Sequence, residues 1–104
     1  MDVVFDLATT QQVPFAVKGD ACLFTPEGCV AFVAACRREG RAILGIECYQ
    51  DASTGPALLP EPLADFSSLP SIPREEYVRQ TCDEALRFIR TAVPAQTLCE
   101  FVLG

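Results

Sequence analysis

The stretch Ala42-Ile43-Leu44-Gly45-Ile46-Glu47-Cys48-Tyr49 decides how this chain folds. Its first five residues are apolar, which is typical of a central β-strand that is covered on both faces. Glu47 is the first ionised group in the stretch, so the strand becomes polar at its exit. We therefore predict an interior strand from Ala42 to Tyr49 with a carboxylate near its end.

This strand opens a window, residues 42–73, that contains no Lys or Arg but does contain acids. The whole chain of 104 residues has a net charge of -6. An acidic surface repels nucleic-acid phosphates and attracts basic proteins. We therefore expect a protein partner with a basic face and no direct contact with nucleic acid, although an acidic mimic of nucleic acid is an alternative. The acids of the window are Glu47, Asp51, Glu61 and Asp65.

The residues before the strand predict a helix and short strands. Thr25-Pro26-Glu27 is typical of a helix start, because it combines a capping hydroxyl, a proline at the first position and an acid near the positive end. Gly40 supplies a left-handed stop. Asp2 to Leu7 and Phe15 to Val17 are rich in β-branched and aromatic residues, which favour strands.

The residues after the strand predict a loop, a helix and a last strand. Gln50 to Pro73 holds five of the eight prolines and is predicted as a long connection across the surface, with a helical turn around Pro62 to Phe66. Pro73 to Ala92 has an apolar stripe of helical period, and Thr97 to Leu103 alternates like a strand. The order predicts one α+β (or small α/β) domain, residues 1–104, with a central sheet of four to five strands and two main helices.

The expected location is the cytoplasm. The N-terminus is acidic where a secretory signal would be basic, and no apolar run approaches the ~20 residues that a membrane span needs. The cysteines are scattered without a CxxC pair, and the chain has no His, so we expect no structural zinc site. Buried free thiols are predicted for Cys22, Cys29, Cys36, Cys48, Cys82 and Cys99.

Neither catalysis nor a cofactor is expected. Without His, a general base near neutral pH would need a strongly shifted carboxylate or thiolate, and the glycines do not cluster into a phosphate-binding loop. A calcium or magnesium site from Glu47, Asp51 and Asp65 matches no loop motif, so no metal is expected.

Glu47 has three interpretations. It forms an ion pair inside the protein, since carboxylates are rarely buried unpaired, or it is exposed at the edge of the sheet, or it is held for a partner. Tyr49 and Phe66 are candidate aromatic anchors beside the acids. A homodimer or adaptor module using the apolar part of the connection is a further alternative. The internal ion-pair partners considered are Arg41, Arg74 and Arg79, and the apolar residues of the connection are Leu58, Leu59 and Leu63.

The order of elements and the segment Ile43 to Tyr49 resemble a family of small bacterial immunity proteins of polymorphic toxin systems. In that family the strand ends Ile-Leu-Gly-Gly-Asp-Val-Tyr and precedes a variable loop and an amphipathic helix. Gly45, Glu47 and Tyr49 stand where the first Gly, the Asp and the Tyr stand, and Ile46 replaces the second Gly. The resemblance implies a binding protein that neutralises a cognate toxin by covering its basic active site. The implied contact residues are Glu47, Tyr49, Asp51, Glu61, Asp65 and Phe66.

Overall fold

The computed structural model describes residues 3–18, 21–52, 55–65, 73–93 and 97–104, and for residues 18, 50–52 and 55–65 it describes the backbone alone. These residues form three helices and five strands in one compact α+β domain. None of the described helices is long and apolar enough to cross a membrane. The elements are α1 (Val3–Thr10), β1 (Ala16–Lys18), β2 (Ala21–Leu23), α2 (Pro26–Glu39), β3 (Ile43–Ala52), β4 (Gly55–Asp65), α3 (Arg74–Ala92) and β5 (Thr97–Leu103).

The predicted first helix is confirmed as α2, with both of its end signals. The Thr25 hydroxyl accepts a hydrogen bond from the Gly28 N–H at 3.1 Å, so it satisfies one of the unpaired N–H groups of the first turn. Gly40 ends the helix with φ 67°, a left-handed conformation that glycine adopts without strain. These local signals explain why the sequence places this helix accurately.

The strands form two antiparallel sheets instead of one sheet of four to five strands. β3 is the central strand of a three-stranded sheet with the order β4-β3-β5, which confirms the predicted interior strand, while β1 and β2 form a separate pair. One residue pair joins the two sheets: Phe24 and Cys99 exchange backbone hydrogen bonds of 2.9 and 2.8 Å. The central sheet is therefore smaller than predicted.

The first predicted strand is wrong, because residues 3–10 form α1. Val4, Leu7 and Ala8 are buried, and their spacing is that of one face of a helix. α1 packs against α2 and β5, so the burial of this face outweighs the β preference of the valines. The next prediction, a strand at Phe15 to Val17, corresponds to β1.

The predicted surface connection contains a strand, β4, at the edge of the sheet. Proline lacks the N–H that a ladder needs, and an edge strand tolerates it. Glu47 pairs with Leu63 and Tyr49 pairs with Leu58, so residues 59–62, including Pro60 and Pro62, bulge opposite Cys48 alone. The helical turn predicted from Pro62 onward is wrong as far as residue 65, and Phe66 lies outside the described residues.

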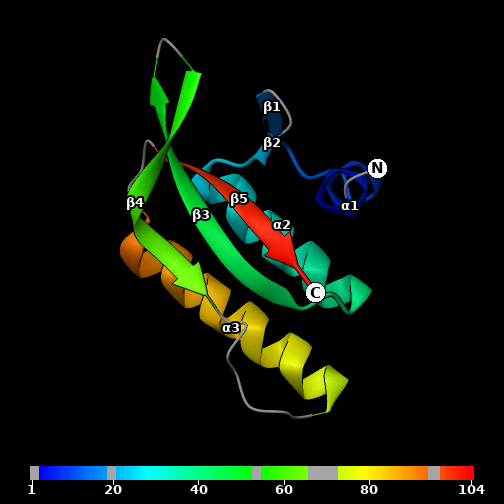
Figure 1. Cartoon of the computed structure of the whole chain (residues 1–104). Helices are drawn as coiled ribbons and strands as arrows, with labels where there is room; N and C mark the ends of the chain where they lie inside the picture. The colour runs from blue at the N-terminus through cyan, green and yellow to red at the C-terminus, as the bar shows by residue number, and fades with distance from the viewer. Residues whose placement is uncertain (1–2, 19–20, 53–54, 66–72, 94–96) are drawn as a thin grey trace.

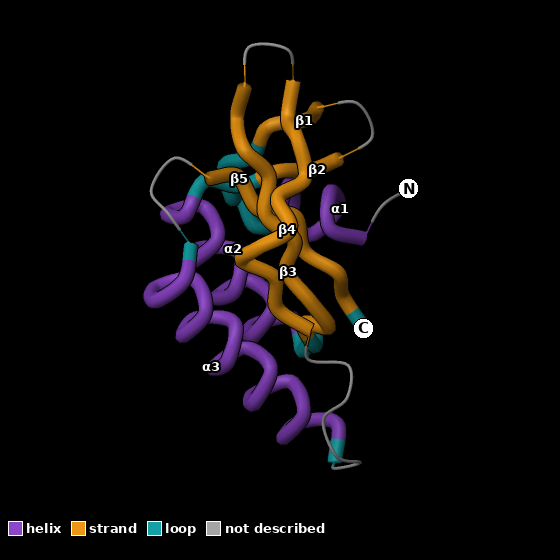
Figure 2. The backbone as a smooth tube through the Cα atoms, turned by 60° about the vertical axis from the view of Figure 1, so that its left-hand side comes forward, coloured by secondary structure: helices purple, strands orange, loops and turns teal. Residues whose placement is uncertain are grey.

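The helices α2 and α3 lie on the same side of the three-stranded sheet (Figures 1 and 2). α3 confirms the predicted second helix and packs against α2 and β3. The buried Thr81 hydroxyl accepts the Ile43 N–H at 3.0 Å and donates to the Val78 carbonyl, which fixes α3 to the start of β3. The two helices thereby cover one face of the three-stranded sheet.

Aromatic rings and thiols fill the space between the sheet and the helices. Phe32 lies between Phe24 and Phe101, with ring centroids 4.6 and 4.7 Å away. All six cysteines are buried, as predicted. Burial raises the pKa of Cys36 to about 12, so this thiol stays protonated at neutral pH. The cysteines therefore serve as small apolar core residues.

Candidate functional site

The candidate site lies on the side of β3 and β5 that faces away from α2 and α3, which we call the outer face. Strand alternation produces it, because every second residue points away from the helices. On β3, Ile46 and Cys48 are buried while Glu47 and Tyr49 are half-buried. β3 is therefore not covered equally on its two sides. The outer face consists of Glu47, Tyr49, Leu98, Glu100 and Val102, of which Val102 is the most exposed at 45%.

Two carboxylates oppose each other across the strands of the outer face. Glu47 of β3 and Glu100 of β5 are direct partners in the antiparallel register. Favourable pairs that face each other in this way contribute about 0.2–1 kcal/mol to a sheet, whereas like charges in the same positions destabilise it. The pairing of these two acids therefore needs a reason other than stability.

The internal ion pair considered for Glu47 is not found. Among the described residues, Glu47 forms no ion pair with the three arginines that the sequence suggested. Arg79 contacts Glu76 instead, and Arg74 donates to the carbonyl oxygen of Gly104. The described residues therefore do not support the internal ion pair, and exposure at the sheet or a role in partner binding are the interpretations that fit.

Tyr49 connects the two carboxylates. Its hydroxyl donates a hydrogen bond of 2.8 Å to Oε1 of Glu100. Burial, the hydrogen bond to Glu100 and the negative charges of Glu100 and Glu47 together raise the pKa of Tyr49 to about 12. The phenol therefore stays neutral at physiological pH and holds Glu100 in one orientation beside Glu47.

The remaining predicted contact residues are spread along β3 and β4. Asp51 lies opposite Pro56 near the end of the hairpin, and Asp65 lies opposite Gly45 at the other end. Glu61 lies in the bulge of β4. The side chains of these three acids, and the whole of Phe66, lie outside the description. The structure thus brings together Glu47 and Tyr49 of the predicted set.

Glu100 is a site residue that was not predicted from the sequence. The alternation of β5 correctly separates Leu98, Glu100 and Val102 from the buried Cys99 and Phe101. The alternation does not predict which strand pairs with β5, because strand pairing depends on contacts between distant parts of the chain. The pairing of residue 100 with residue 47 appears only in the folded sheet.

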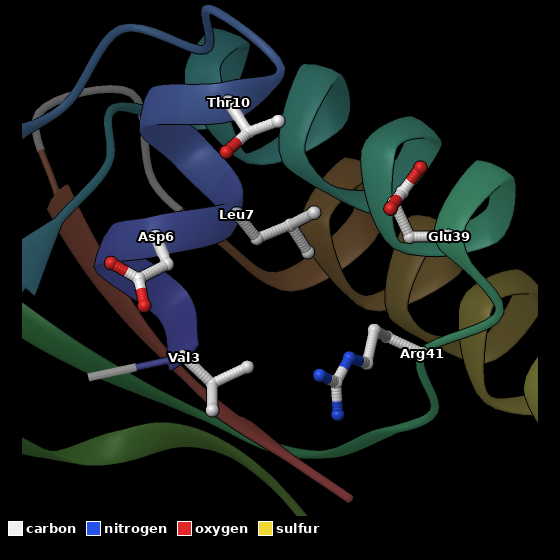
Figure 3. Close-up of a pocket in the computed structure, with 6 residues that line it drawn as sticks. All are labelled: Val3, Asp6, Leu7, Thr10, Glu39 and Arg41. Atoms are coloured by element: carbon white, nitrogen blue, oxygen red, sulfur yellow. The ribbon is translucent and has the colours of Figure 1, made fainter. Parts of the chain in front are cut away.

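A separate hollow of about 210 Å³ lies between α1 and the end of α2 (Figure 3). Arg41 extends its guanidinium group into this space, while Asp6 and Glu39 lie at its rim. Glu39 accepts an exposed hydrogen bond from Gln11, so it already has a partner. Within the described part of the chain, no three acidic or thiol side chains gather in a way that could hold a metal ion.

Comparisons with protein-family models, curated proteins and solved structures gave no match to this chain. The resemblance to immunity proteins therefore stays a prediction that depends on the residues quoted above.

The raised pKa of Tyr49 predicts that the free energy of unfolding depends on pH in alkaline solution. Because the pKa of Tyr49 is about 12 in the folded protein and about 10 when unfolded, the folded state retains the proton longer. The contribution of Tyr49 to the free energy of unfolding should hold below pH 10 and fall as pH rises from about 10 to about 12, in addition to the fall that buried thiols such as Cys36 cause from about pH 9 upward. Urea unfolding at several pH values measures this, and Tyr49→Phe should reduce the fall. An equal fall in Tyr49→Phe would contradict the assignment.

The opposed carboxylates predict a substitution that stabilises the protein. Glu47→Gln removes one of the two like charges and should raise the free energy of unfolding by about 0.5 kcal/mol at pH 7. It should also lower the pKa of Tyr49, because the charge of Glu47 contributes to raising it. Urea denaturation measures the first effect and absorbance titration in a Tyr77→Phe background the second. A loss of stability would mean that Glu47 has a structural role.

Proposed function

We propose that this protein is a cytoplasmic, non-catalytic binding protein whose outer face covers a basic surface of a partner protein, as an immunity protein covers the active site of its toxin. The observation that supports this proposal is the Glu47 and Glu100 pair, two carboxylates opposite each other, where Glu47 forms no ion pair with an arginine among the described residues. A cationic side chain of a partner inserted there would replace repulsion with attraction.

The outer face combines charge with apolar surface, as protein interfaces do. Leu98 and Val102 flank Glu100 along β5, and Tyr49 lies opposite Leu98 on β3 with its hydroxyl already bonded. Tyrosine is enriched at interfaces because it offers a large rigid ring and loses little side-chain entropy on binding. In this arrangement the acids attract and orient the partner, and the apolar groups exclude water.

Blocking requires no chemistry on this chain. A nuclease or another enzyme that acts on a polyanion needs a basic cleft, and an acidic protein that occupies the cleft excludes the substrate. Asp51, Glu61 and Asp65, on the same two strands of the hairpin, would extend the acidic surface. Self-association through the outer face is disfavoured, because two copies would bring the same acids together.

Site-specific crosslinking tests the proposed face directly. A photoreactive amino acid is introduced at position 102 on the outer face, or at position 17 on β1 as a control of similar exposure; Val102 and Val17 are 45% and 55% exposed. In native cells, position 102 should crosslink to one basic protein, and that protein should lose activity when this chain is added. Equal crosslinking from position 17, or a partner whose activity is unchanged, would reject the proposal. Crosslinked dimers of this chain would instead support the homodimer alternative.

A further inference from the structure

We propose a second binding site, separate from the outer face: a hollow between the end of α2 and the start of α3 that takes a small organic acid, an apolar group with one carboxylate. The hollow has a volume of about 360 Å³, within the range of pockets that bind small ligands. Its lining residues come from the end of α2 and the start of α3. These two helices pack together on one side of the sheet (Figure 2). The residues that line the hollow are Arg37, Gly40, Arg74, Glu75, Val78 and Arg79.

Helical spacing creates this hollow. Arg74 and Val78 are four residues apart on α3, and so are Glu75 and Arg79, which places two neighbouring rows of side chains against the last turn of α2. Gly40 ends α2 without a side chain, and a Cβ added there would meet nothing within 4 Å. Val78 is buried, and it lines the hollow together with the aliphatic stems of the arginines. The hollow therefore offers an apolar wall below charged groups.

The guanidinium groups supply the anion recognition. Arg37 and Arg79 are each paired with a carboxylate, Asp83 and Glu76, but both pairs are exposed and such pairs hold their members weakly. Arg74 donates to a backbone carbonyl at 3.3 Å and forms no ion pair among the described residues. Arginine binds a carboxylate with two parallel hydrogen bonds, so these side chains suit a ligand that carries a carboxylate.

The start of α3 adds a second attraction for an anion. Pro73 occupies the N-cap and has no side chain that can accept the N–H groups of the first turn. These groups carry the positive end of the helix dipole beside Arg74. Glu75, however, places one negative charge on the wall, and the chain as a whole is acidic. This balance favours a single carboxylate over a doubly charged phosphate.

A titration with straight-chain carboxylates tests the site on the full chain. Amide chemical shifts are followed by NMR while acetate, hexanoate or inorganic phosphate is added, and a peptide ending in a free leucine carboxylate is compared with its amide to identify the source of the carboxylate. Hexanoate or the free-carboxylate peptide should give saturable shifts in residues 37–40 and 74–79, and should bind more tightly than acetate and phosphate.

Matched variants complete the test. Arg74→Gln should weaken hexanoate binding at least about tenfold, because it removes a charge-assisted hydrogen bond. Arg79→Gln is the second variant, and Arg90→Gln, the same change at the other end of α3, should alter binding less than about twofold. The absence of saturation, equal binding of acetate and hexanoate, or equal weakening by Arg90→Gln would overturn the proposal. Circular dichroism confirms that each variant is folded.

Discussion

The double variant Glu47→Lys/Glu100→Lys should bind the partner at least about a hundredfold more weakly than the wild type, a loss of about 2.7 kcal/mol. In the wild type the two carboxylates attract cations of the partner, and in the variant two ammonium groups repel them. The variant keeps two like charges opposite each other, so its fold experiences a similar internal repulsion. The reduced affinity should therefore report the sign of the charge at the interface. Titration calorimetry with the purified partner measures it.

A control with the same change in net charge separates local from general effects. Glu39→Lys/Glu84→Lys also exchanges two acids, but on α2 and α3, away from the outer face. It should lower the affinity by less than about threefold at physiological salt, because exposed charges more than about 8 Å away are screened. If both double variants weaken binding alike, net charge alone explains the attraction. If neither weakens it, the outer face is not the interface.

Phe24→Ala should produce the largest loss of stability, about 3–5 kcal/mol. Phe24 is fully buried, its ring packs against three other phenylalanine rings, and its backbone pairs with Cys99 to bridge the two sheets. Truncation leaves a cavity at the place where β2 meets β5. A small domain has a total stability of only about 5–15 kcal/mol, so the variant would be close to unfolding.

Guanidinium denaturation of the wild type, Phe24→Ala and Phe24→Leu measures this loss, with Leu as the milder change. Val17→Ala, on the exposed side of β1, should cost less than about 0.5 kcal/mol and serves as the control. A loss below about 1 kcal/mol for Phe24→Ala would show that the two sheets do not depend on this junction.

Local signals in the sequence predicted most elements of the fold. Thr25 caps the start of α2 and Gly40 caps its end, the apolar stripe of α3 has a clear helical period, and β3 and β5 follow from composition and alternation. Each of these signals acts over a few residues. They can be interpreted without knowing which elements pack against each other.

The elements that were missed depend on distant contacts. α1 contains valines that favour a strand, but its buried side chains pack against α2 and β5. β4 contains prolines that suggest a loop, yet an edge strand with a bulge accommodates them. Of the site residues, Glu47 and Tyr49 were predicted from the sequence of β3 itself. Glu100 could not be predicted as a site residue, because only the pairing of β3 with β5 places it opposite Glu47.

The salt dependence of the association rate is the most direct test of the central claim, that opposed carboxylates on the outer face attract a basic partner. Stopped-flow mixing of the wild type with the purified partner gives this rate. It should fall at least about tenfold between about 20 mM and about 500 mM salt, because ions screen the steering field. Glu47→Gln/Glu100→Gln should flatten this dependence. A rate that does not change with salt would contradict the account.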